Sequence, residues 1–182
     1  MRHAGFVLVG GRSSRMGRDK ALLDWHGMPL AQHVAQAVLQ AAGSVMLIGD
    51  PGRYSGLGYE VRPDERPGLG PAGGVATALR LGRAEWNLIV ACDMPKISPE
   101  ALRLLLERTR TSQANCIVPV ASNCELEPLC AVYHVRCLVP LDRAIRANRL
   151  KMKDLVVELG ADLVAGLEPQ LLANFNTPED CA

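Results

Sequence analysis

A group of glycines and basic side chains near the amino terminus has the composition of an anion-binding loop. Between Gly10 and Lys20, directly after a short apolar run, the chain carries three glycines, three arginines and one lysine against a single acidic residue, Asp19. Glycines let backbone N–H groups approach an anion closely, and arginine and lysine form charge-assisted hydrogen bonds with phosphate oxygens. Because the formal net charge of the whole chain is only +1, this local concentration of positive charge predicts a phosphate-binding loop.

Two familiar phosphate-loop patterns are absent from this segment. It contains neither the G-x-x-x-x-G-K-[ST] pattern of the Walker A loop nor the G-x-G-x-x-G pattern of dinucleotide-binding folds. A solvated basic turn is the alternative interpretation. Two glycines placed directly after a buried first strand are unusual for such a turn, and they favour the anion-binding interpretation.

A carboxylate follows a second apolar run. Asp93 stands in the segment Cys92-Asp93-Met94-Pro95, directly after the mostly apolar residues 87–91. Mg²⁺ takes oxygen ligands and is commonly held by one or two carboxylates together with substrate phosphates. A phosphate loop after one strand and a carboxylate after another therefore predict magnesium–nucleotide chemistry, with Asp93 as the metal ligand. A turn or helix cap is the alternative role for this aspartate.

A long segment rich in proline, glycine and charge lies between these two features. It runs from Pro63 to Gly74, and its small residues suit close approach to a base or sugar. Asp64 sits just past an expected strand, where its carboxylate could accept hydrogen bonds from a ribose or base. A surface connection without a ligand is the alternative.

Apolar strands that alternate with amphipathic helices must position these loops. Apolar residues recur at helical spacing from Leu30 to Ala42, with Gly43 as a natural stop. Ser98-Pro99-Glu100 has the capping serine and first-position proline of a helix start. We expect further helices at 75–81, 137–148 and 150–159, loops at 49–58 and 63–74, and strands at 5–9, 45–48, 59–62, 87–91, 116–120, 128–134 and 161–164.

This alternation predicts an α/β fold with three layers, α/β/α, around a mainly parallel sheet. We expect one domain that spans residues 1–182. In such folds the ligand lies at the carboxyl ends of the strands. The rule directs attention to the loops after Val9, Arg62 and Ala91, which are the three segments described above.

Composition and charge exclude several classes of protein. Hydrophobic residues make up 48% of the chain, which is ordinary for a globular protein, and no apolar run is long enough to span a membrane. A net charge of +1 gives no basis for a nucleic-acid or membrane partner. The six cysteines show no C-x-x-C spacing and no secretion signal precedes them. We therefore expect reduced thiols in a cytoplasmic protein, rather than a metal or redox centre.

The segment from Leu8 to Lys20 resembles the signature of molybdenum cofactor guanylyltransferases, a family with the Rossmann-like fold of nucleotide-diphospho-sugar transferases. The resemblance covers nearly the whole chain. Asp64 resembles the family's aspartate after the third strand. Gly70-Pro71-Ala72-Gly73-Gly74 resembles its loop near the base, and Cys92-Asp93-Met94-Pro95 resembles its metal-binding D-x-P element.

Two segments of the second half resemble the parts of that family that face the acceptor. Glu127-Pro128-Leu129 resembles an acceptor-facing strand, and the segment from Asn174 to Asp180 resembles the carboxyl-terminal N-x-N-T-P-E-[ED] motif, which faces molybdopterin. The resemblance thus implies a nucleotide-binding half at 1–95 and an acceptor-binding half at 96–182.

The implied reaction transfers GMP from GTP to the terminal phosphate of molybdenum-molybdopterin and releases pyrophosphate. The nucleophile is then a phosphate monoester that is already anionic, so catalysis rests on positioning and charge neutralisation. The implied catalytic residues are Arg15, Lys20 and Asp93, with Asp93 as the Mg²⁺ ligand. The implied nucleotide-binding residues are Leu8, Val9, Gly10, Gly11, Lys20, Asp64, Gly70, Gly74 and Asp93, and the implied acceptor-binding residues are Glu127, Pro128, Asn174 and Asn176.

Two departures from the family pattern and three alternatives remain. Val9 stands where alanine is usual, and Gly49-Asp50 stands where an asparagine often helps to read guanine, although Asp50 could accept from guanine N1 and N2. A CTP-dependent molybdopterin cytidylyltransferase and a sugar- or alcohol-phosphate nucleotidyltransferase would share the fold. A non-catalytic nucleotide-binding protein could instead deliver cofactor, with molybdoenzyme maturation proteins as partners. Retention of both Lys20 and Asp93 argues against it, because a pure binder need not keep a metal carboxylate.

Overall fold

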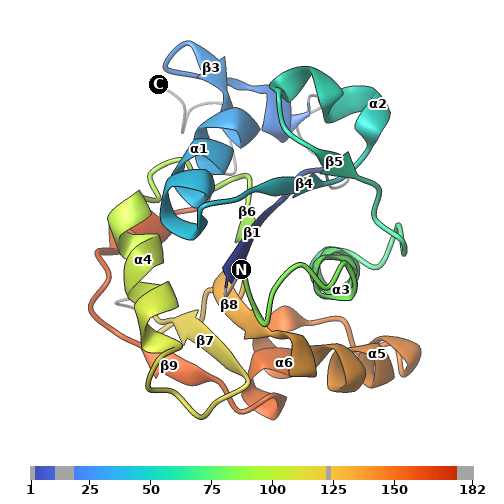
Figure 1. Ribbon diagram of the computed structural model, residues 1–182, viewed down its shortest axis with the longest axis vertical. Coiled ribbons are helices and arrows are strands. Elements are labelled where there is room, and N and C mark those ends of the chain that lie inside the picture. The colour runs from blue at the N-terminus through green and yellow to red at the C-terminus, as the bar shows by residue number, and fades with distance from the viewer. Residues whose placement is uncertain (1–2, 11–18, 122–123, 176–182) are drawn as a thin grey trace.

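A seven-stranded sheet runs through the centre of the molecule (Figure 1). The computed structural model describes residues 3–10, 19–121 and 124–175. The strand order across the sheet is β5-β4-β1-β6-β8-β7-β9. The strands are β1 (His3–Leu8), β4 (Met46–Ile48), β5 (Val61–Arg62), β6 (Trp86–Ala91), β7 (Cys116–Pro119), β8 (Cys130–His134) and β9 (Asp162–Val164).

The direction of the strands decides which loops share an edge. Parallel pairs join β1 to β4 and β6, β4 to β5, and β7 to β9, so the predicted α/β fold with a mainly parallel sheet is confirmed. Strand β8 runs antiparallel to both of its neighbours, β6 and β7. The start of β8 therefore lies at the same edge of the sheet as the carboxyl ends of β1 and β6.

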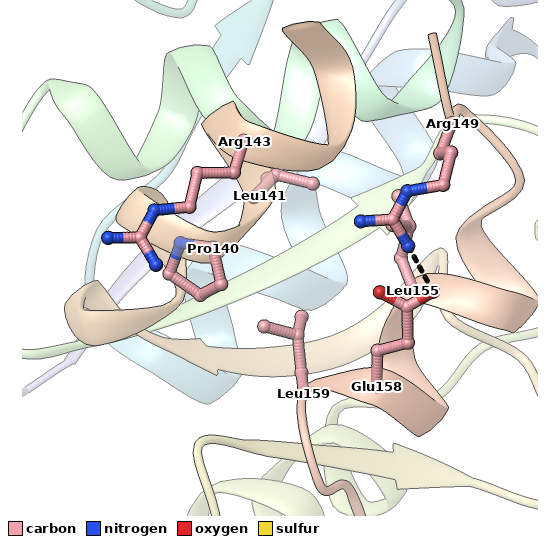
Figure 2. A pocket seen from close by; sticks show the side chains of 7 residues that line it. All are labelled: Pro140, Leu141, Arg143, Arg149, Leu155, Glu158 and Leu159. Atoms are coloured by element: carbon pink, nitrogen blue, oxygen red, sulfur yellow. Dashed lines mark hydrogen bonds and ion pairs between the residues drawn. The ribbon is translucent and has the colours of Figure 1, made fainter. Parts of the chain in front are cut away.

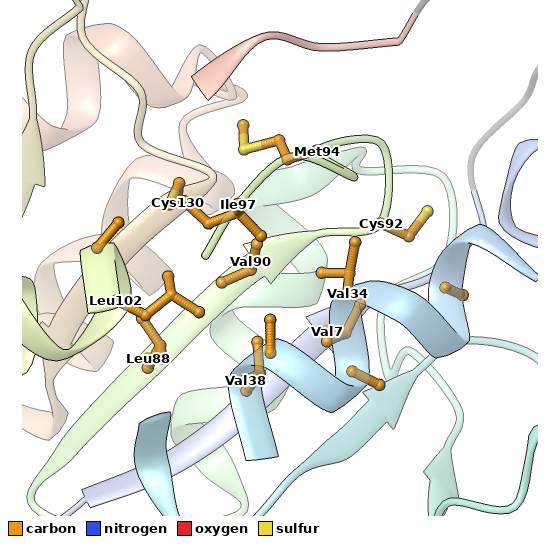
Figure 3. Packing of buried hydrophobic residues seen from close by; sticks show 14 of the residues in the cluster. Val7, Val34, Val38, Leu88, Val90, Cys92, Met94, Ile97, Leu102 and Cys130 are labelled. Carbon is orange, nitrogen blue, oxygen red and sulfur yellow. The ribbon is translucent and has the colours of Figure 1, made fainter. Parts of the chain in front are cut away.

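Helices cover both faces of the sheet and complete the three predicted layers (Figure 1). On β6, Leu88 and Val90 face the cluster under α1 and α4 (Figure 3), whereas Ile89 faces α3, α5 and α6, as the period of two in a strand requires. In the described part of the chain, no helix is long and apolar enough to cross a bilayer. The main helices are α1 (Leu30–Ala42), α3 (Pro71–Arg80), α4 (Pro99–Arg108), α5 (Leu138–Arg146) and α6 (Met152–Glu158).

Local capping signals place α1 and α4 as the sequence predicts. Gly43 adopts a left-handed conformation with a φ of 76°, and its N–H donates to the carbonyl of Leu39 at 2.9 Å, which ends α1. The side chain of Ser98 accepts a hydrogen bond from the N–H of Ala101 at 3.2 Å, and Pro99 is the first residue of α4. Both predicted helix boundaries are thus confirmed.

The segment 49–58, predicted as a loop, contains a short helix. Asp50 caps α2 (Pro51–Tyr54) by accepting a hydrogen bond from the N–H of Gly52 at 2.9 Å. A 3-10 turn, η2 (Ser55–Leu57), follows. The Asp-Pro dipeptide is therefore a helix start, with an N-cap followed by proline at the first helical position, rather than a turn.

Two further elements differ from the sequence prediction. Helix α3 starts at Pro71, so the last part of the predicted loop 63–74 is helical. A hairpin of β2 (Asp24–Trp25) and β3 (Met28–Pro29) precedes α1. Its two central residues, at 26 and 27, have φ values of 52° and 86°, as a type I′ turn requires. They are histidine and glycine rather than the usual Asn-Gly or Asp-Gly, so the hairpin lacks its common sequence signal.

Gly49 lies where the carboxyl ends of β1 and β4 meet, and a side chain there has no room. A Cβ atom at this position would lie 2.5 Å from both the carbonyl oxygen and a methyl carbon of Val9, and 3.0 Å from the ring of Tyr54. We expect Gly49→Ala to lower the free energy of unfolding by about 1–3 kcal/mol, because the backbone of Val9 must shift. Urea denaturation measures this loss.

Gly56→Ala is the matched control for this substitution. No described atom lies within 4 Å of a Cβ atom built at Gly56. We expect this variant to be neutral or to raise the free energy of unfolding by roughly 0.4–1 kcal/mol, because alanine reduces the freedom of the unfolded chain. Equal losses at Gly49 and Gly56 would contradict the close contact with Val9 as the cause.

Candidate functional site

Backbone hydrogen bonds continue the sheet beyond the strand ends and bring three segments together. The N–H of Cys92 donates to the carbonyl of Leu8 at 3.2 Å, and the N–H of Ala91 donates to the carbonyl of Leu129 at 2.7 Å. The loop after β1, the loop after β6 and the start of β8 therefore meet at one edge. Ligands bind at this edge in parallel α/β sheets.

The predicted phosphate loop leaves the sheet through Val9 and Gly10. Val9 remains hydrogen-bonded to the end of β4 through its N–H, at 2.9 Å. Gly10 has a φ of 96°, which glycine adopts without strain, and a Cβ atom there would lie 3.4 Å from the hydroxyl of Tyr54. Gly11 and Arg15 lie outside the described residues, so their predicted roles stay predictions.

Asp19 attaches the far end of this loop to α2. Its Oδ1 accepts a hydrogen bond from the N–H of Ala21 at 3.1 Å and so caps the 3-10 turn η1 (Lys20–Leu22). Its Oδ2 accepts a hydrogen bond from the hydroxyl of Tyr54 at 2.7 Å and lies 3.7 Å from Arg53. Burial, together with the bond to Asp19, raises the pKa of Tyr54, so the phenol stays protonated and remains a donor.

Lys20 and Asp93, both predicted as catalytic, lie close together. The Nζ atom of Lys20 is 3.9 Å from Oδ2 of Asp93 and donates a hydrogen bond to the carbonyl of Phe175 at 2.8 Å. The N–H of Phe175 in turn donates to the carbonyl of Asp93 at 2.8 Å. The end of the phosphate loop, the end of β6 and a segment near the carboxyl terminus therefore converge at one point.

Asp93 sits between two residues that anchor its backbone in the core. Cys92 and Met94 are 7% and 1% exposed and belong to the hydrophobic cluster beneath α1 (Figure 3), whereas the Asp93 side chain is 28% exposed. Burial raises the pKa of Asp93, and the positive charge of Lys20 opposes that shift only in part. An additional cation at this edge would therefore stabilise the charged form of Asp93.

A divalent metal at this edge would have Asp93 as its protein carboxylate. Within residues 3–10, 19–121 and 124–175, no group of three or more histidine, cysteine, aspartate or glutamate side chains could hold a metal ion. Mg²⁺ usually keeps several waters and binds through one or two carboxylates plus substrate phosphates. A single carboxylate beside a phosphate loop fits that mode of binding.

The second predicted ligand loop is tied to α3 through Asp64. Oδ1 of Asp64 accepts a hydrogen bond from the hydroxyl of Thr77 at 3.0 Å. Gly70 starts α3 with a φ of 62° and a ψ of −153°, a conformation essentially restricted to glycine. A Cβ atom at Gly74 would lie 3.1 Å from the side chain of Leu8, so this glycine lets α3 approach β1 closely. Direct nucleotide contacts by Asp64, Gly70 and Gly74 stay predictions.

A cleft of about 570 Å³ adjoins the segment that carries Phe175. Three of the four predicted acceptor residues line it, and the fourth, Asn176, lies outside the described residues. The side chain of Asn174 donates a hydrogen bond to the carboxylate of Glu127. The lining residues are Pro71, Glu125, Glu127, Pro128, Leu129, Leu150, Lys151, Met152, Lys153, Asp154 and Asn174.

Charges of both signs face this cleft. Burial raises the pKa of Glu127, Lys153 opposes the shift, and the negative charges of Glu125 and Asp93 reinforce it. The negative charge of Asp93 therefore acts on a carboxyl group that lines the cleft. Lys153 also lies 3.6 Å from Glu125, and Lys151 adds a further positive charge to the lining.

Sequence reasoning misses Tyr54, Lys151 and Lys153, because only tertiary contacts bring these side chains to the edge of the sheet. Sequence reasoning also misses one pattern that is visible in the sequence itself. Residues 68–73 fit the spacing G-x-G-x-x-G, follow strand β5 and run into the first turn of helix α3. A glycine pattern in that position indicates close approach of backbone to a ligand.

A smaller cavity of about 140 Å³ lies between α5 and α6 (Figure 2). Arg149 and Glu158 form an ion pair at its rim. No predicted site residue lines it, so the larger cleft is the candidate for a second substrate. The residues around the smaller cavity are Pro140, Leu141, Arg143, Arg149, Leu155, Glu158 and Leu159.

The raised pKa of Asp93 leads to a stability prediction that does not depend on catalysis. A carboxyl group whose pKa is higher in the folded chain than in the unfolded chain binds more protons in the folded state. The free energy of unfolding therefore decreases as pH rises through the window above the usual pKa of 3.8. We expect Asp93→Asn to gain stability relative to the unmodified chain as pH rises from below 3.8 to neutrality without added metal. Urea denaturation over a pH series measures the gain.

Asp162 provides a control of opposite sign. Its hydrogen bond with Arg108 lowers the pKa of Asp162 below 3.8, so this carboxylate stabilises the fold above that pH and loses its effect as pH falls through the lowered value. We expect Asp162→Asn to lose stability at neutral pH and to approach the unmodified chain in acid. A difference between Asp93→Asn and the unmodified chain that does not change with pH would contradict the assignment for Asp93.

Comparison with known proteins agrees with this geometry. A protein of Flavobacterium johnsoniae named "Probable molybdenum cofactor guanylyltransferase" is 38% identical over 177 residues, which cover 96% of this chain and 92% of that protein. A protein of the same name from Deinococcus radiodurans is 33% identical over 176 residues and covers 97% and 90%. The solved structure of molybdopterin-guanine dinucleotide biosynthesis protein A from Archaeoglobus fulgidus has a TM-score of 0.78 and 25% identity, over 98% of this chain and 94% of its own. Residues 5–161 match the model of the MobA-like NTP transferase domain, and the chain belongs to this family.

Proposed function

We propose that this chain transfers GMP from GTP to the terminal phosphate of molybdenum-molybdopterin and releases pyrophosphate. The observation that carries the proposal is the approach of Lys20 to Asp93, at 3.9 Å, beside the phosphate loop and next to a cleft of about 570 Å³. A cleft of this volume accommodates a small-molecule substrate. The guanylyltransferases that resemble this chain over nearly its whole length support GTP and molybdopterin as the two substrates.

The proposed reaction needs no activated side-chain nucleophile. An oxygen of the acceptor phosphate, already anionic at neutral pH, attacks the α-phosphorus of GTP. The new P–O bond forms as the bond from the α-phosphorus to the oxygen bridging the β-phosphate breaks, and pyrophosphate leaves with the electron pair. Catalysis then consists of alignment of the two phosphates and stabilisation of the charge that shifts between them.

Lys20 is assigned to the triphosphate, together with Arg15 and the backbone N–H groups from Leu8 to Gly11. The carbonyl of Phe175 orients the Lys20 ammonium by a hydrogen bond of 2.8 Å. Asp93 is assigned to Mg²⁺, which when bound supplies charge neutralisation at the phosphate oxygens. The acceptor is assigned to the cleft, where Asn174 and the lysines on its wall offer donors to a phosphate.

The two substrates thus divide one proposed domain between them. Residues 1–95 bind the nucleotide, and residues 96–182 bind the acceptor, except that Phe175 returns to the nucleotide side. Asp50 is 60% exposed at the end of β4, where its carboxylate can accept from N1 and N2 of guanine. We place the chain in the cytoplasm, where the free cysteines of its described residues stay reduced, with molybdoenzyme maturation proteins as partners.

A nucleotide panel tests the proposed substrate. Purified protein with Mg²⁺ and molybdenum-molybdopterin is offered GTP, CTP, ATP or UTP, and pyrophosphate release is followed. We expect release with GTP alone, because Asp50 matches the donors of guanine. Release with CTP instead would assign the chain to the cytidylyltransferases, and GTP binding without release would assign it to cofactor delivery.

Lys20 and Asp93 carry the chemistry in this proposal, so their removal must reduce turnover rather than folding. We expect Lys20→Ala and Asp93→Asn each to lower kcat by roughly 10²–10³-fold, as the loss of one charge-stabilising group does in comparable sites. Circular dichroism should show an unchanged fold. Pyrophosphate release measures the rate.

Arg103→Ala is the matched control, because it removes an exposed cation that lies on α4 and bonds Glu100 and the carbonyl of Gln40. We expect this variant to retain full activity. Full activity of Lys20→Ala or Asp93→Asn would remove that residue from the proposed mechanism.

A further inference from the structure

The ring of Phe175 is held by two side chains from other parts of the chain. Its centroid lies 4.8 Å from that of Trp25, with the ring planes at 80°, which is an edge-to-face contact. The ammonium of Lys96 lies 5.8 Å from the same ring centroid, within the range of a cation–π contact. Trp25 belongs to β2 and Lys96 to the turn that joins β6 to α4. We call this arrangement the Phe175 clamp.

The backbone of Phe175 forms one hydrogen bond with the side chain of Lys20 and another with the backbone of Asp93. Its N–H donates to the carbonyl of Asp93 at 2.8 Å, and its carbonyl accepts from Nζ of Lys20 at 2.8 Å. Lys20 is a long side chain with four rotatable bonds, and a fixed acceptor restricts where its ammonium can go. The position of Phe175 therefore helps to decide the position of the charge that meets the triphosphate.

Phe175 is buried, but it is a member of neither of the two hydrophobic clusters found among the described residues. Phe175 is 7% exposed, and its ring contacts Trp25 and Lys96. A residue of this kind contributes to the local order of its segment more than to the central core. Its neighbour Asn174 lines the acceptor cleft, so the same segment borders both proposed substrates.

We propose that Phe175 is a positioning residue: its clamped ring fixes the backbone that orients Lys20 for the triphosphate of GTP. This inference rests on the proposed function, because it names how the proposed nucleotide site is preorganised. Preorganisation improves binding by removing the entropy cost of ordering a side chain when the ligand arrives. Loss of the ring leaves the hydrogen-bonding groups of residue 175 in the chain but no longer holds them in place.

A double-mutant cycle on GTP affinity tests whether Phe175 acts through Lys20. Titration calorimetry with GTP and Mg²⁺ gives the dissociation constant for the unmodified chain, Phe175→Ala, Lys20→Ala and the double variant. We expect Phe175→Ala to weaken GTP binding by about three- to ten-fold when Lys20 is present. We expect no further weakening when Lys20 is already alanine. Equal effects of Phe175→Ala in both backgrounds would overturn the proposal, because a merely structural role is additive.

Conservative variants sharpen this test. Trp25→Phe keeps an aromatic partner and should retain most of the GTP affinity, whereas Trp25→Ala should reproduce the effect of Phe175→Ala. The matched control is Trp86→Phe, which alters a similar edge-to-face pair with His134, whose ring centroid lies 4.8 Å away, at the other end of β6. We expect Trp86→Phe to leave GTP affinity unchanged. A loss of affinity in this control as large as that in Trp25→Ala would contradict a specific role for the clamp.

Fluorescence tests the clamp without any substrate. The chain has two tryptophans, so the Trp86→Phe variant reports on Trp25 alone. We expect Phe175→Ala in that background to shift Trp25 emission to longer wavelength and to increase its quenching by acrylamide, at unchanged circular dichroism. Unchanged emission and quenching would show that the clamp is absent and would overturn the inference. GTP binding with no pyrophosphate release from the unmodified chain would count against the proposed reaction, while the cycle would still decide the role of Phe175.

Discussion

The reversal of β8 within an otherwise parallel part of the sheet is the constraint on which the site depends. Because β6 and β8 are antiparallel, the end of one and the start of the other share an edge, joined by the bond from Ala91 to Leu129. A parallel β8 would place Glu127 and Pro128 at the far end of the strand, roughly 17 Å away. The observed direction lets one rim carry the end of the basic loop, the Asp93 carboxylate and the cleft lined by Asn174.

Lys20 and Asp93 approach each other at this rim without forming a tight salt bridge. Lys20 approaches Asp93 only to 3.9 Å and makes its short hydrogen bond, of 2.8 Å, to a backbone carbonyl instead. Burial keeps the pKa of Asp93 above its usual value, and the positive charge of Lys20 opposes that shift only in part. A tight salt bridge would compete with a cation for the carboxylate and with phosphates for the ammonium.

Sequence patterns predicted the parts of this structure that depend on neighbours in the chain. Gly43 and Ser98 end and start helices through contacts within four residues, and the alternation of apolar strands with helices predicted the layers and the edge that holds Asp93. Tyr54 donates a hydrogen bond to Asp19, 35 positions away. Lys151 lines the cleft only because the tertiary fold places the start of α6 there. Such long-range contacts leave no local pattern. The Asp-Pro start of α2 was locally visible, but the same dipeptide also begins turns.

The hydrogen bond from Lys20 to Phe175 joins residues 155 positions apart. Chains are synthesised from the amino terminus, and their early parts begin to fold before the rest is made. Strand β1 and the basic loop therefore exist long before the carbonyl that steadies their lysine. A prematurely terminated product would carry the loop without that carbonyl and without the wall residue Asn174. On the proposed mechanism, the chain becomes competent for chemistry only after residue 175 has been synthesised.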